Sequence, residues 1–403
     1  MNAPRENVLE LTEDLIRIES HLDAPEREAK IGRFLADWFR GRGIDAELQP
    51  VDGERANVIA RIPGGDGPSL LLNGHLDTVP AGDMESAFSP RVEDGVLWGR
   101  GACDMKGAIA AMAIALAQIH TGQARERSSA SLAGDLLFVG TVDEESGSLG
   151  AKALIDGGVR ADYAVVGEPS NLRVTVAHKG SCFVRVSLAG RSAHGSCPDQ
   201  GVNAASYAAR IVAAIEDDLR PRLAGRSYEL LGPSTVSVGR ICGGTQPNIV
   251  AERCEIEIDR RYLPREADPV PEVRALVASI CDDVDGLSYD VCEMPMTSVV
   301  RHRPLGTSPD SVLARAAQEA CREAGLPAEP IGVTYWSDGG HFAANGVETI
   351  VLGPGDIANA HGPGDRVPVV ELETAVDLYL GIARGLLAAQ SASSGGGVSR
   401  QPS

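Results

Sequence analysis

Between residues 6 and 42, apolar side chains recur at the three- and four-residue spacing of an amphipathic helix. This spacing predicts one or two helices, which end at Gly41 and Gly43. Further along, short apolar runs typical of buried strands alternate with helical segments, which indicates an α/β fold with a mostly parallel sheet. The predicted strands are Ala46–Gln49, Asn57–Ile62, Leu70–His75, Asp135–Thr141 and Tyr163–Val166, and the helices among them are Ala108–His120 and 149–156.

The pattern changes at about residue 178, where polar and apolar residues begin to alternate. In Lys179–Ala189 this alternation predicts a strand with one exposed face. The later segments complete a β-α-β-β-α-β order, which indicates a ferredoxin-like α+β unit: an open antiparallel sheet with helices on one face. They are helix Asn203–Leu219, strands Ser234–Ile241 and Ile249–Arg261, helix Pro269–Val284 and strand Ser288–Cys292.

The first pattern returns at about residue 295, with helix Ser311–Ala324, strand Thr349–Leu352 and helix Glu371–Ala389. The small domain, residues 178–294, is therefore predicted to be inserted into a large domain made of residues 1–177 and 295–390. A chain of 403 residues is also too long for one ordinary core. Residues 391–403 are rich in Ser and Gly and are expected to form a flexible tail.

Charge and composition narrow the classes of partner. The formal net charge of −19 disfavours nucleic acid and anionic membranes, and an anionic substrate would need a basic residue in its pocket. The N-terminal pattern is an amphipathic helix rather than a secretory signal, and the longest apolar run, Ala108–Ile119, is judged too short to span a bilayer. Eight cysteines without a C-x-x-C pair favour free thiols in the cytoplasm.

Acidic and histidine side chains follow directly after several predicted strands or open the next turn. Ligands bind at this carboxyl-terminal edge in open α/β sheets, so we expect these side chains to converge. Imidazoles together with carboxylates form a mixed nitrogen and oxygen set that suits Zn²⁺ or Mn²⁺. The candidate residues are His75, Asp104, Glu144, Glu145, Glu168 and His361.

His75 and Asp77 follow the apolar run that begins at Leu70. Residues two apart on an extended chain face the same way, so the Asp77 carboxylate can accept one ring N–H of His75 and leave the other nitrogen for a metal. The alternative for this stretch alone is a buried histidine with a hydrogen-bond partner. The acidic and histidine residues downstream favour the metal site.

The order of these motifs resembles the dinuclear-metal amidohydrolase and peptidase family of acetylornithine deacetylase, succinyl-diaminopimelate desuccinylase, aminoacylase and glutamate carboxypeptidase. The resemblance covers nearly the whole chain and agrees with the predicted insertion. The matching stretches are residues 74–80 (GHLDTVP), 99–107 (GRGACDMKG), 143–145 (DEE), 167–170 (GEPS), 190–194 (GRSAH), 243–248 (GGTQPN) and 353–356 (GPGD), followed by His361.

The resemblance implies two divalent metal ions, with zinc favoured and cobalt or manganese as alternatives. Asp104 would bridge the two ions. His75 and Glu168 would complete the shell of one ion, and Glu145 and His361 that of the other. A bridging carboxylate is suited to this role because it can hold two cations close together.

The resemblance also implies that Glu144 is the general base for a water held between the ions, and that Asp77 orients His75. From the sequence alone Glu144 and Glu145 cannot be told apart, and Asp143 could be confused with them. The order of residues in the family decides the assignment.

In the inserted domain the resemblance implies that His194 reaches the active site of a partner subunit, which makes a homodimer the expected assembly. Asn248 and Arg261 would hold the carboxylate of the substrate, Arg261 through its two-pronged guanidinium. Ser337 and Asp338 match the Ser/Thr-Asp of the family and are further substrate-binding candidates. The alternatives are a structural ion pair for Arg261 and a surface turn for His194.

Two features depart from the family pattern. The acid that follows the last histidine ligand is usually a Glu, and Asp365 is the nearest candidate for it here. Tyr335 and Trp336 precede the Ser-Asp pair, where they could line an acyl pocket or pack in the core.

These residues predict a metal-dependent hydrolase that cleaves the amide bond of a small N-acyl amino acid or dipeptide, closest in type to acetylornithine deacetylase. The alternatives are a desuccinylase, a metallo-carboxypeptidase or dipeptidase, and, from another class, an inactive metal- or ligand-binding relative. The pair Glu144-Glu145 disfavours the inactive relative, because such a protein needs no base. A nucleotide site at residues 99–107 is disfavoured because the turn lacks G-x-G-x-x-G and a Walker lysine.

Overall fold

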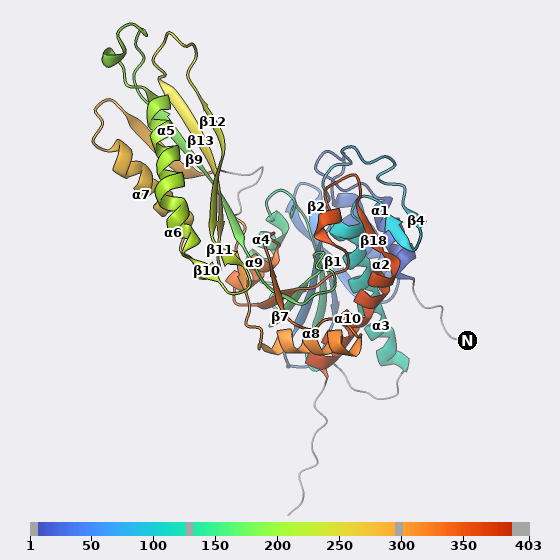
Figure 1. The fold of residues 1–403 in the computed structure, drawn as a ribbon. Coiled ribbons are helices and arrows are strands. Elements are labelled where there is room, and N and C mark those ends of the chain that lie inside the picture. Colours follow the sequence, from blue (N-terminus) through green and yellow to red (C-terminus); the bar gives the residue numbers. More distant parts are fainter. Residues whose placement is uncertain (1–6, 126–131, 295–300, 389–403) are drawn as a thin grey trace, which may run out of the picture.

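The computed structural model describes residues 7–125, 132–294 and 301–388. Figure 1 shows two bodies, a large one around a nine-stranded sheet and an elongated one around a four-stranded sheet. The chain enters the elongated body through β9 (Gly180–Ala189) and leaves it after β14 (Ser288–Glu293). The predicted return point at residue 295 and the predicted flexible tail, residues 391–403, lie outside the described residues.

The large sheet has four parallel strands at its centre, in the order β6-β3-β7-β17. On one side β2 and β1 continue it in antiparallel pairing, and on the other side β8 and β15 do so, with β16 parallel to β8. The predicted α/β class is thus confirmed. The strands are β1 (Asp45–Asp52), β2 (Arg55–Ile62), β3 (Leu70–His75), β6 (Leu136–Thr141), β7 (Tyr163–Val166), β8 (Thr175–His178), β15 (Leu305–Gly306), β16 (Ile331–Val333) and β17 (Glu348–Val351).

Helices cover both faces of this sheet. Because side chains alternate along a strand, Leu70 and Leu72 of β3 enter one core and Leu71 enters the other. Burial on both faces explains why the central strands are continuous apolar runs. The first core is covered by α1 (Val8–Ile16), α2 (Ala29–Arg40), α3 (Gly107–Arg125), α8 (Val312–Glu323) and α10 (Val369–Leu387), and the second by α4 (Leu149–Asp156) and α9 (Gly339–Ala344). A small separate sheet consists of β4 (Arg91–Glu93), β5 (Val96–Trp98) and β18 (Arg366–Pro368).

The elongated body contains an antiparallel sheet in the order β12-β13-β9-β14, with helices on one face (Figure 1). Alternate residues of β13 point into its core, such as Ile256 and Ile258, whereas Glu255 and Glu257 between them lie on the opposite face. The sequence order β9-α5-β12-β13-α7-β14 is the predicted one. The new elements are α5 (Ala204–Ala214), α6 (Arg220–Ala224), β10 (Ser227–Tyr228), β11 (Gly232–Pro233), β12 (Thr235–Gly243), β13 (Arg253–Tyr262) and α7 (Pro269–Cys281).

Three predicted boundaries in this body are wrong by three residues or more, and the helix predicted as Pro269–Val284 ends at Cys281 as α7. The helix predicted for Asn203–Leu219 is α5, a π-helical turn and then α6, which extends to Ala224. Asn203 caps α5 by accepting the N–H groups of Ala205 and Ser206. The strand predicted to begin at Ile249 begins at Arg253 as β13, because Ile249 instead forms an isolated bridge with His194.

Within the described residues one helical stretch, Ala102–Gly122, is long and apolar enough to cross a membrane. The prediction that its apolar run is too short to span a bilayer is therefore wrong. This stretch is 89% buried inside the protein. It includes α3, which packs against α1 and α10 in the first core. A core helix passes the same length and composition test.

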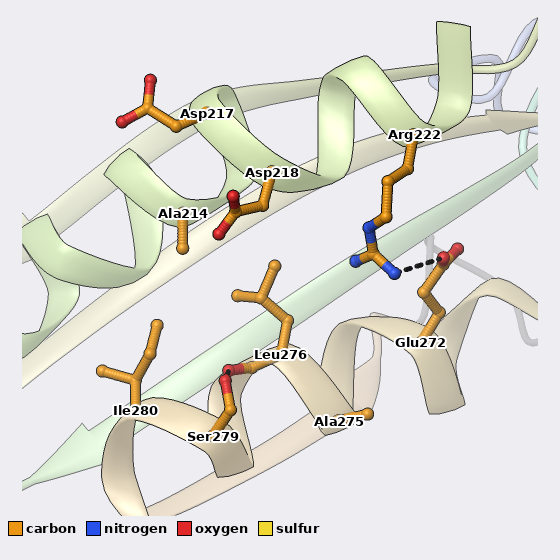
Figure 2. A pocket seen from close by; sticks show the side chains of 9 residues that line it. All are labelled: Ala214, Asp217, Asp218, Arg222, Glu272, Ala275, Leu276, Ser279 and Ile280. Atoms are coloured by element: carbon orange, nitrogen blue, oxygen red, sulfur yellow. Dashed lines mark hydrogen bonds and ion pairs between the residues drawn. The ribbon is translucent and has the colours of Figure 1, made fainter. Parts of the chain in front are cut away.

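A groove of about 570 Å³ lies between the α5–α6 segment and α7 in the elongated body. Figure 2 shows Arg222 pointing across it toward Glu272, with which it forms an ion pair of 3.7 Å. None of the predicted site residues lines this groove.

Candidate metal centre

Three predicted site segments follow the carboxyl ends of neighbouring parallel strands. His75 ends β3, Glu144 and Glu145 follow the end of β6, and Glu168 follows the end of β7. The three strands are paired in parallel register, so their ends lie at the same edge of the sheet. The predicted convergence of these residues thus has a direct cause in the topology.

Asp104 comes from the Gly-rich turn that opens α3. Gly101 in this turn has φ +84°, and a Cβ there would lie 2.9 Å from side-chain atoms of Thr78 and Lys106. Only glycine fits this backbone position without strain. The turn can therefore fold back tightly and direct Asp104 toward His75.

Asp365 supports this turn. Its carboxylate accepts the backbone N–H groups of Gly101 at 2.7 Å and Cys103 at 2.9 Å, and Arg100 donates to it at 3.1 Å. Burial raises the pKa of Asp365 to about 6, although these donors act in the other direction. The acid after the last histidine thus holds the segment that carries Asp104.

Two groups of potential metal ligands share Asp104. His75, Asp104 and Glu168 form the first group, and Asp104, Glu145 and His361 form the second, with the ligand atoms of each group within 4.8 Å of one another. Asp104 Oδ1 lies 2.8 Å from Nε2 of His75, and Asp104 Oδ2 lies 3.2 Å from Nε2 of His361. The same His361 nitrogen lies 3.1 Å from the Glu145 carboxylate. One carboxylate therefore faces both groups, each through a different oxygen.

The electrostatics of the cluster favour cations. Burial raises the pKa of Glu168, and the nearby carboxylates of Asp104 and Glu145 act in the same direction. Burial acts on Asp104 as well, but hydrogen bonds with His361 and His75 outweigh it and lower the pKa of Asp104. Hydrogen bonds with Asp104 and Glu145 raise the pKa of His361 to about 10. So many carboxylates in one buried place require positive charge nearby.

The donor set fits two divalent cations. Each group offers one imidazole nitrogen and carboxylate oxygens, which suits Zn²⁺, Co²⁺ or Mn²⁺ better than a thiolate-selective site. Oε1 of Glu168 is buried without a hydrogen-bond partner, and a bound cation would satisfy it.

Asp77 contacts both halves of the cluster. Nδ1 of His75 lies 2.9 Å from the backbone carbonyl oxygen of Asp77 and 3.6 Å from its carboxylate, so the carbonyl makes the shorter contact. The carboxylate accepts the backbone N–H groups of Glu144 at 3.1 Å and Glu145 at 2.9 Å. The expectation that the carboxylate is the main hydrogen-bond partner of the ring is therefore corrected.

Glu144 lies beside the two groups without belonging to either. Burial is the largest influence on its pKa and raises it, and the neighbouring Glu168 carboxylate adds to the effect. A buried carboxyl group that lies beside both ligand groups and belongs to neither is placed for proton transfer.

Ser337 and Asp338 lie behind the cluster, with 0% and 1% of their surface exposed. Ser337 Oγ is 3.1 Å from Nε2 of His178, and Asp338 accepts a hydrogen bond of 2.8 Å from the Thr141 hydroxyl at the end of β6. Neither side chain is open to a substrate in this structure, in contrast to the predicted substrate-binding role.

The two aromatic residues before this pair have different surroundings. Tyr335 donates a hydrogen bond of 2.7 Å to the carbonyl oxygen of Pro169, next to Glu168. Trp336 stacks on His302 with ring centroids 3.3 Å apart. Tyr335 thus supports the turn after β7, and Trp336 packs at the junction of the two bodies.

The predicted small-domain residues are not brought to the cluster together. His194 and Asn248 are neighbours, since the N–H of Gly195 donates to the carbonyl of Asn248. They follow β9 and β12, at the end of the elongated body far from the large sheet (Figure 1). Arg261 lies at the opposite end of the same sheet, in register with Ser181 and beside the junction.

Comparison with known proteins agrees with this geometry. The profile of peptidase family M20/M25/M40 matches residues 71–385. The acetylornithine deacetylase of Myxococcus xanthus is 33% identical over 358 residues, which cover 84% of this chain and 88% of that protein. The acetylornithine deacetylase of Shigella sonnei is 31% identical over 368 residues, covering 88% and 89% respectively.

Solved structures share the fold. A tripeptidase from Staphylococcus aureus superposes with a TM-score of 0.76 at 24% identity, covering 94% of this chain and 98% of that one. A Bacillus subtilis protein described as a dinuclear metal-binding peptidase of the M20 family has a TM-score of 0.69 at 17% identity, covering 94% and 97%. The predicted enzyme class, a metal-dependent amidohydrolase acting on C–N bonds, is confirmed, and the chain belongs to peptidase family M20/M25/M40.

Proposed function

We propose that this protein is a deacylase that hydrolyses the amide bond of a small N-acyl amino acid, of the acetylornithine deacetylase type. The observation that carries the proposal is the pair of ligand groups sharing Asp104, with the buried Glu144 beside them and assigned to neither. The identity of about one third to acetylornithine deacetylases over most of the chain supports the substrate class.

Each residue of the cluster has a role in the proposal. His75, Asp104 and Glu168 would hold one divalent ion, and Asp104, Glu145 and His361 would hold the other. Bound divalent ions, with zinc favoured, polarise the scissile carbonyl and lower the pKa of water.

Glu144 takes the proton from the attacking water and passes it to the leaving amine. Asp77 orients His75 through its carbonyl and fixes the backbone of Glu144 through its carboxylate.

Peptide hydrolysis is the second candidate, because the solved structures that share the fold include a tripeptidase and other peptidases. A desuccinylase is a further alternative within the same chemistry. A panel of N-acetyl and N-succinyl amino acids, dipeptides and tripeptides, assayed with Zn²⁺, Mn²⁺ and Co²⁺, tests the proposal. Turnover of N-acetyl amino acids well above that of peptides supports it, and the reverse ranking rejects it.

Arg261 is proposed to bind the free carboxylate of the substrate. It lies at the end of the small sheet beside the junction, and its guanidinium also pairs with Asp259 at 3.0 Å. Burial lowers the pKa of Lys179, and the positive charge of Arg261 adds to this effect, so the two cations lie near each other. A cation beside the junction would suit an anionic substrate on a chain whose net charge is −19.

We expect Arg261→Lys to lower kcat/KM for N-acyl amino acids by about 30-fold or more, because truncating one partner of such a pair costs about 2–5 kcal/mol. The corresponding amides lack the carboxylate and should be poor substrates that the substitution barely affects. The matched control is Arg240→Lys, which alters an arginine on the same sheet paired with Glu257 at 2.9 Å. Equal hydrolysis of acid and amide by the wild type would reject the carboxylate role.

His194 is proposed to act in the site of a partner subunit. The ten-residue strand β9 separates the junction from the His194 segment by about 30 Å, so His194 lies far from the metal cluster of its own chain. Asn248 lies beside it and is proposed to contact the same substrate. The inserted domain, residues 178–294, would then serve as the dimerisation and lid domain.

Mixing two inactive variants tests this assembly. In a heterodimer of His194→Ala and Glu144→Gln subunits, one site has both Glu144 and the partner's His194. We expect activity to recover in proportion to the heterodimer fraction, measured after subunit exchange followed by mass spectrometry. Demonstrated exchange without recovery would show that His194 does not act across subunits.

A further inference from the structure

A buried ion cluster lies behind the turn that carries Glu144 and Glu145. Arg55 of β2 donates to both oxygens of Glu28, from Nε at 2.8 Å and from Nη2 at 2.7 Å. Nη2 also donates to Oδ1 of Asp143 at 2.6 Å. The exposed fractions of the Arg55, Glu28 and Asp143 side chains are 8%, 2% and 4%.

Asp143 is held at both its side chain and its backbone. Its N–H donates to Oε1 of Glu28 at 3.1 Å, while its carboxylate accepts from Arg55. Its φ is +72°, in the left-handed region that residues other than glycine rarely adopt. The contacts with Arg55 and Glu28 therefore hold Asp143, the residue before Glu144, in a backbone conformation that the chain alone disfavours.

Hydrogen bonds from backbone N–H groups to buried carboxylates continue along the turn, from Asp143 to Glu145. Three consecutive backbone N–H groups, those of Asp143, Glu144 and Glu145, each donate to a buried carboxylate: the first to Glu28, the other two to Asp77. Glu28 precedes α2 but makes no capping bond to that helix, so its carboxylate serves this cluster instead. The turn is therefore held at Asp143 by Arg55 and Glu28, and at Glu144 and Glu145 by Asp77.

Charge explains why Arg55 is needed. Burial is the largest influence on the pKa of Glu28 and raises it; hydrogen bonds from Arg55 lower it, and the charge of Asp77 raises it again. Arg55 is the cation that bonds both Glu28 and Asp143. Without it, buried carboxylates next to the metal cluster would repel one another and the turn would shift.

We propose that Arg55, through Glu28 and Asp143, is a positioning residue that sets the geometry of Glu144 and Glu145. The proposal deepens the proposed function, on which its kinetic part rests. The hydrogen-bond partners of Arg55, Glu28 and Asp143, belong to neither ligand group, and Arg55 acts through the backbone of the turn. Mutation of residues that hold metal ligands in place typically lowers metal affinity or activity by about 10- to 100-fold.

The test compares Arg55→Lys with Arg301→Lys in the full-length protein. Lysine keeps the charge but cannot form the forked contacts. Arg301 is the matched control: it binds Glu293 through two hydrogen bonds of 2.8 and 2.7 Å and Asp268 at 2.8 Å, away from the metal cluster. Both variants should lose thermal stability, so stability alone does not separate positioning from packing.

For Arg55→Lys we expect kcat to fall about 10- to 100-fold with KM within about twofold of wild type. One of two metal equivalents should become easier for a chelator to remove, since Glu145 belongs to only one ligand group. Arg301→Lys should keep kcat and both equivalents. Wild-type kcat and metal retention in Arg55→Lys, or equal losses in both variants, would overturn the proposal.

A second variant covers the case in which Arg55→Lys does not fold. Asp143→Asn leaves the Arg55–Glu28 pair intact and removes the carboxylate charge with which Arg55 pairs on the turn. It should show the same kcat loss and the same weakening of one metal equivalent, and wild-type values would overturn the proposal. The chelator measurement needs no substrate, so it tests positioning even if the panel of N-acyl amino acids rejects the deacylase assignment.

Discussion

Glu144→Gln is expected to lower kcat by about two to four powers of ten, the contribution typical of general acid–base catalysis. Glutamine has the same shape and keeps the backbone bond from residue 144 to Asp77. Its amide cannot accept a proton from water, so the chemical step fails while the site stays assembled. Metal content, measured on the same preparation by elemental analysis, should equal that of the wild type.

Glu145→Gln is the control for this experiment. Glu145 lies 3.1 Å from His361 within the second ligand group, so its substitution should remove metal from that group. Glu144→Gln should thus lose turnover and retain metal, whereas Glu145→Gln should lose metal. Near-wild-type activity of Glu144→Gln at full metal occupancy would reverse the assignment of the pair.

The metal-binding part of the site could be predicted from the sequence because its residues follow strands. An apolar run followed directly by His or Glu places that side chain at the end of a strand, and parallel strands bring their ends together. His75 and Glu168 satisfy this rule in the observed register of β3 and β7. His361 comes ten residues after β17 ends, so this rule places it less closely, and the family resemblance assigned it to the second ion.

The rule that residues two apart face the same way failed at Asp77 for a local reason. It assumes an extended chain, but β3 ends at His75, so Asp77 lies beyond the strand. There the carbonyl of Asp77 lies at the ring, and its carboxylate accepts the N–H groups of residues 144 and 145. Because β3 ends two residues before Asp77, the carbonyl of Asp77 rather than its carboxylate makes the shorter contact with the histidine.

The contacts that support the site could not be predicted from sequence patterns, because they join segments that are far apart in the chain. Arg55 lies 27 residues from Glu28 and 88 from Asp143, and Arg100 lies 265 residues from Asp365. No periodicity relates such positions, and each residue resembles an ordinary surface charge in its own segment. Among these residues, Asp365 could be noticed in the sequence by its spacing from His361. Its carboxylate, however, supports the turn before Asp104.

Asp104→Asn is expected to have an effect as large as that of Glu144→Gln, by a different route. The two oxygens of Asp104 face His75 and His361 separately, at 2.8 and 3.2 Å, so both ligand groups depend on this one carboxylate. Asparagine removes its charge and replaces one oxygen with an NH₂ group that cannot bind a cation. We expect the purified variant to lose both metal equivalents.

Activity of Asp104→Asn should fall on the order of 10³-fold or more even with added metal, because metal-ion catalysis supplies several kcal/mol of transition-state stabilisation. Glu168→Gln, which alters only the first group, should retain about one equivalent of metal in the same dialysis. Asp356→Asn is the matched control, since its carboxylate only caps a short helical turn through the N–H of Ala358. If Asp104→Asn lost one equivalent and kept the other tightly, Asp104 would serve a single ion, and the shared-carboxylate arrangement on which the proposed chemistry rests would be wrong.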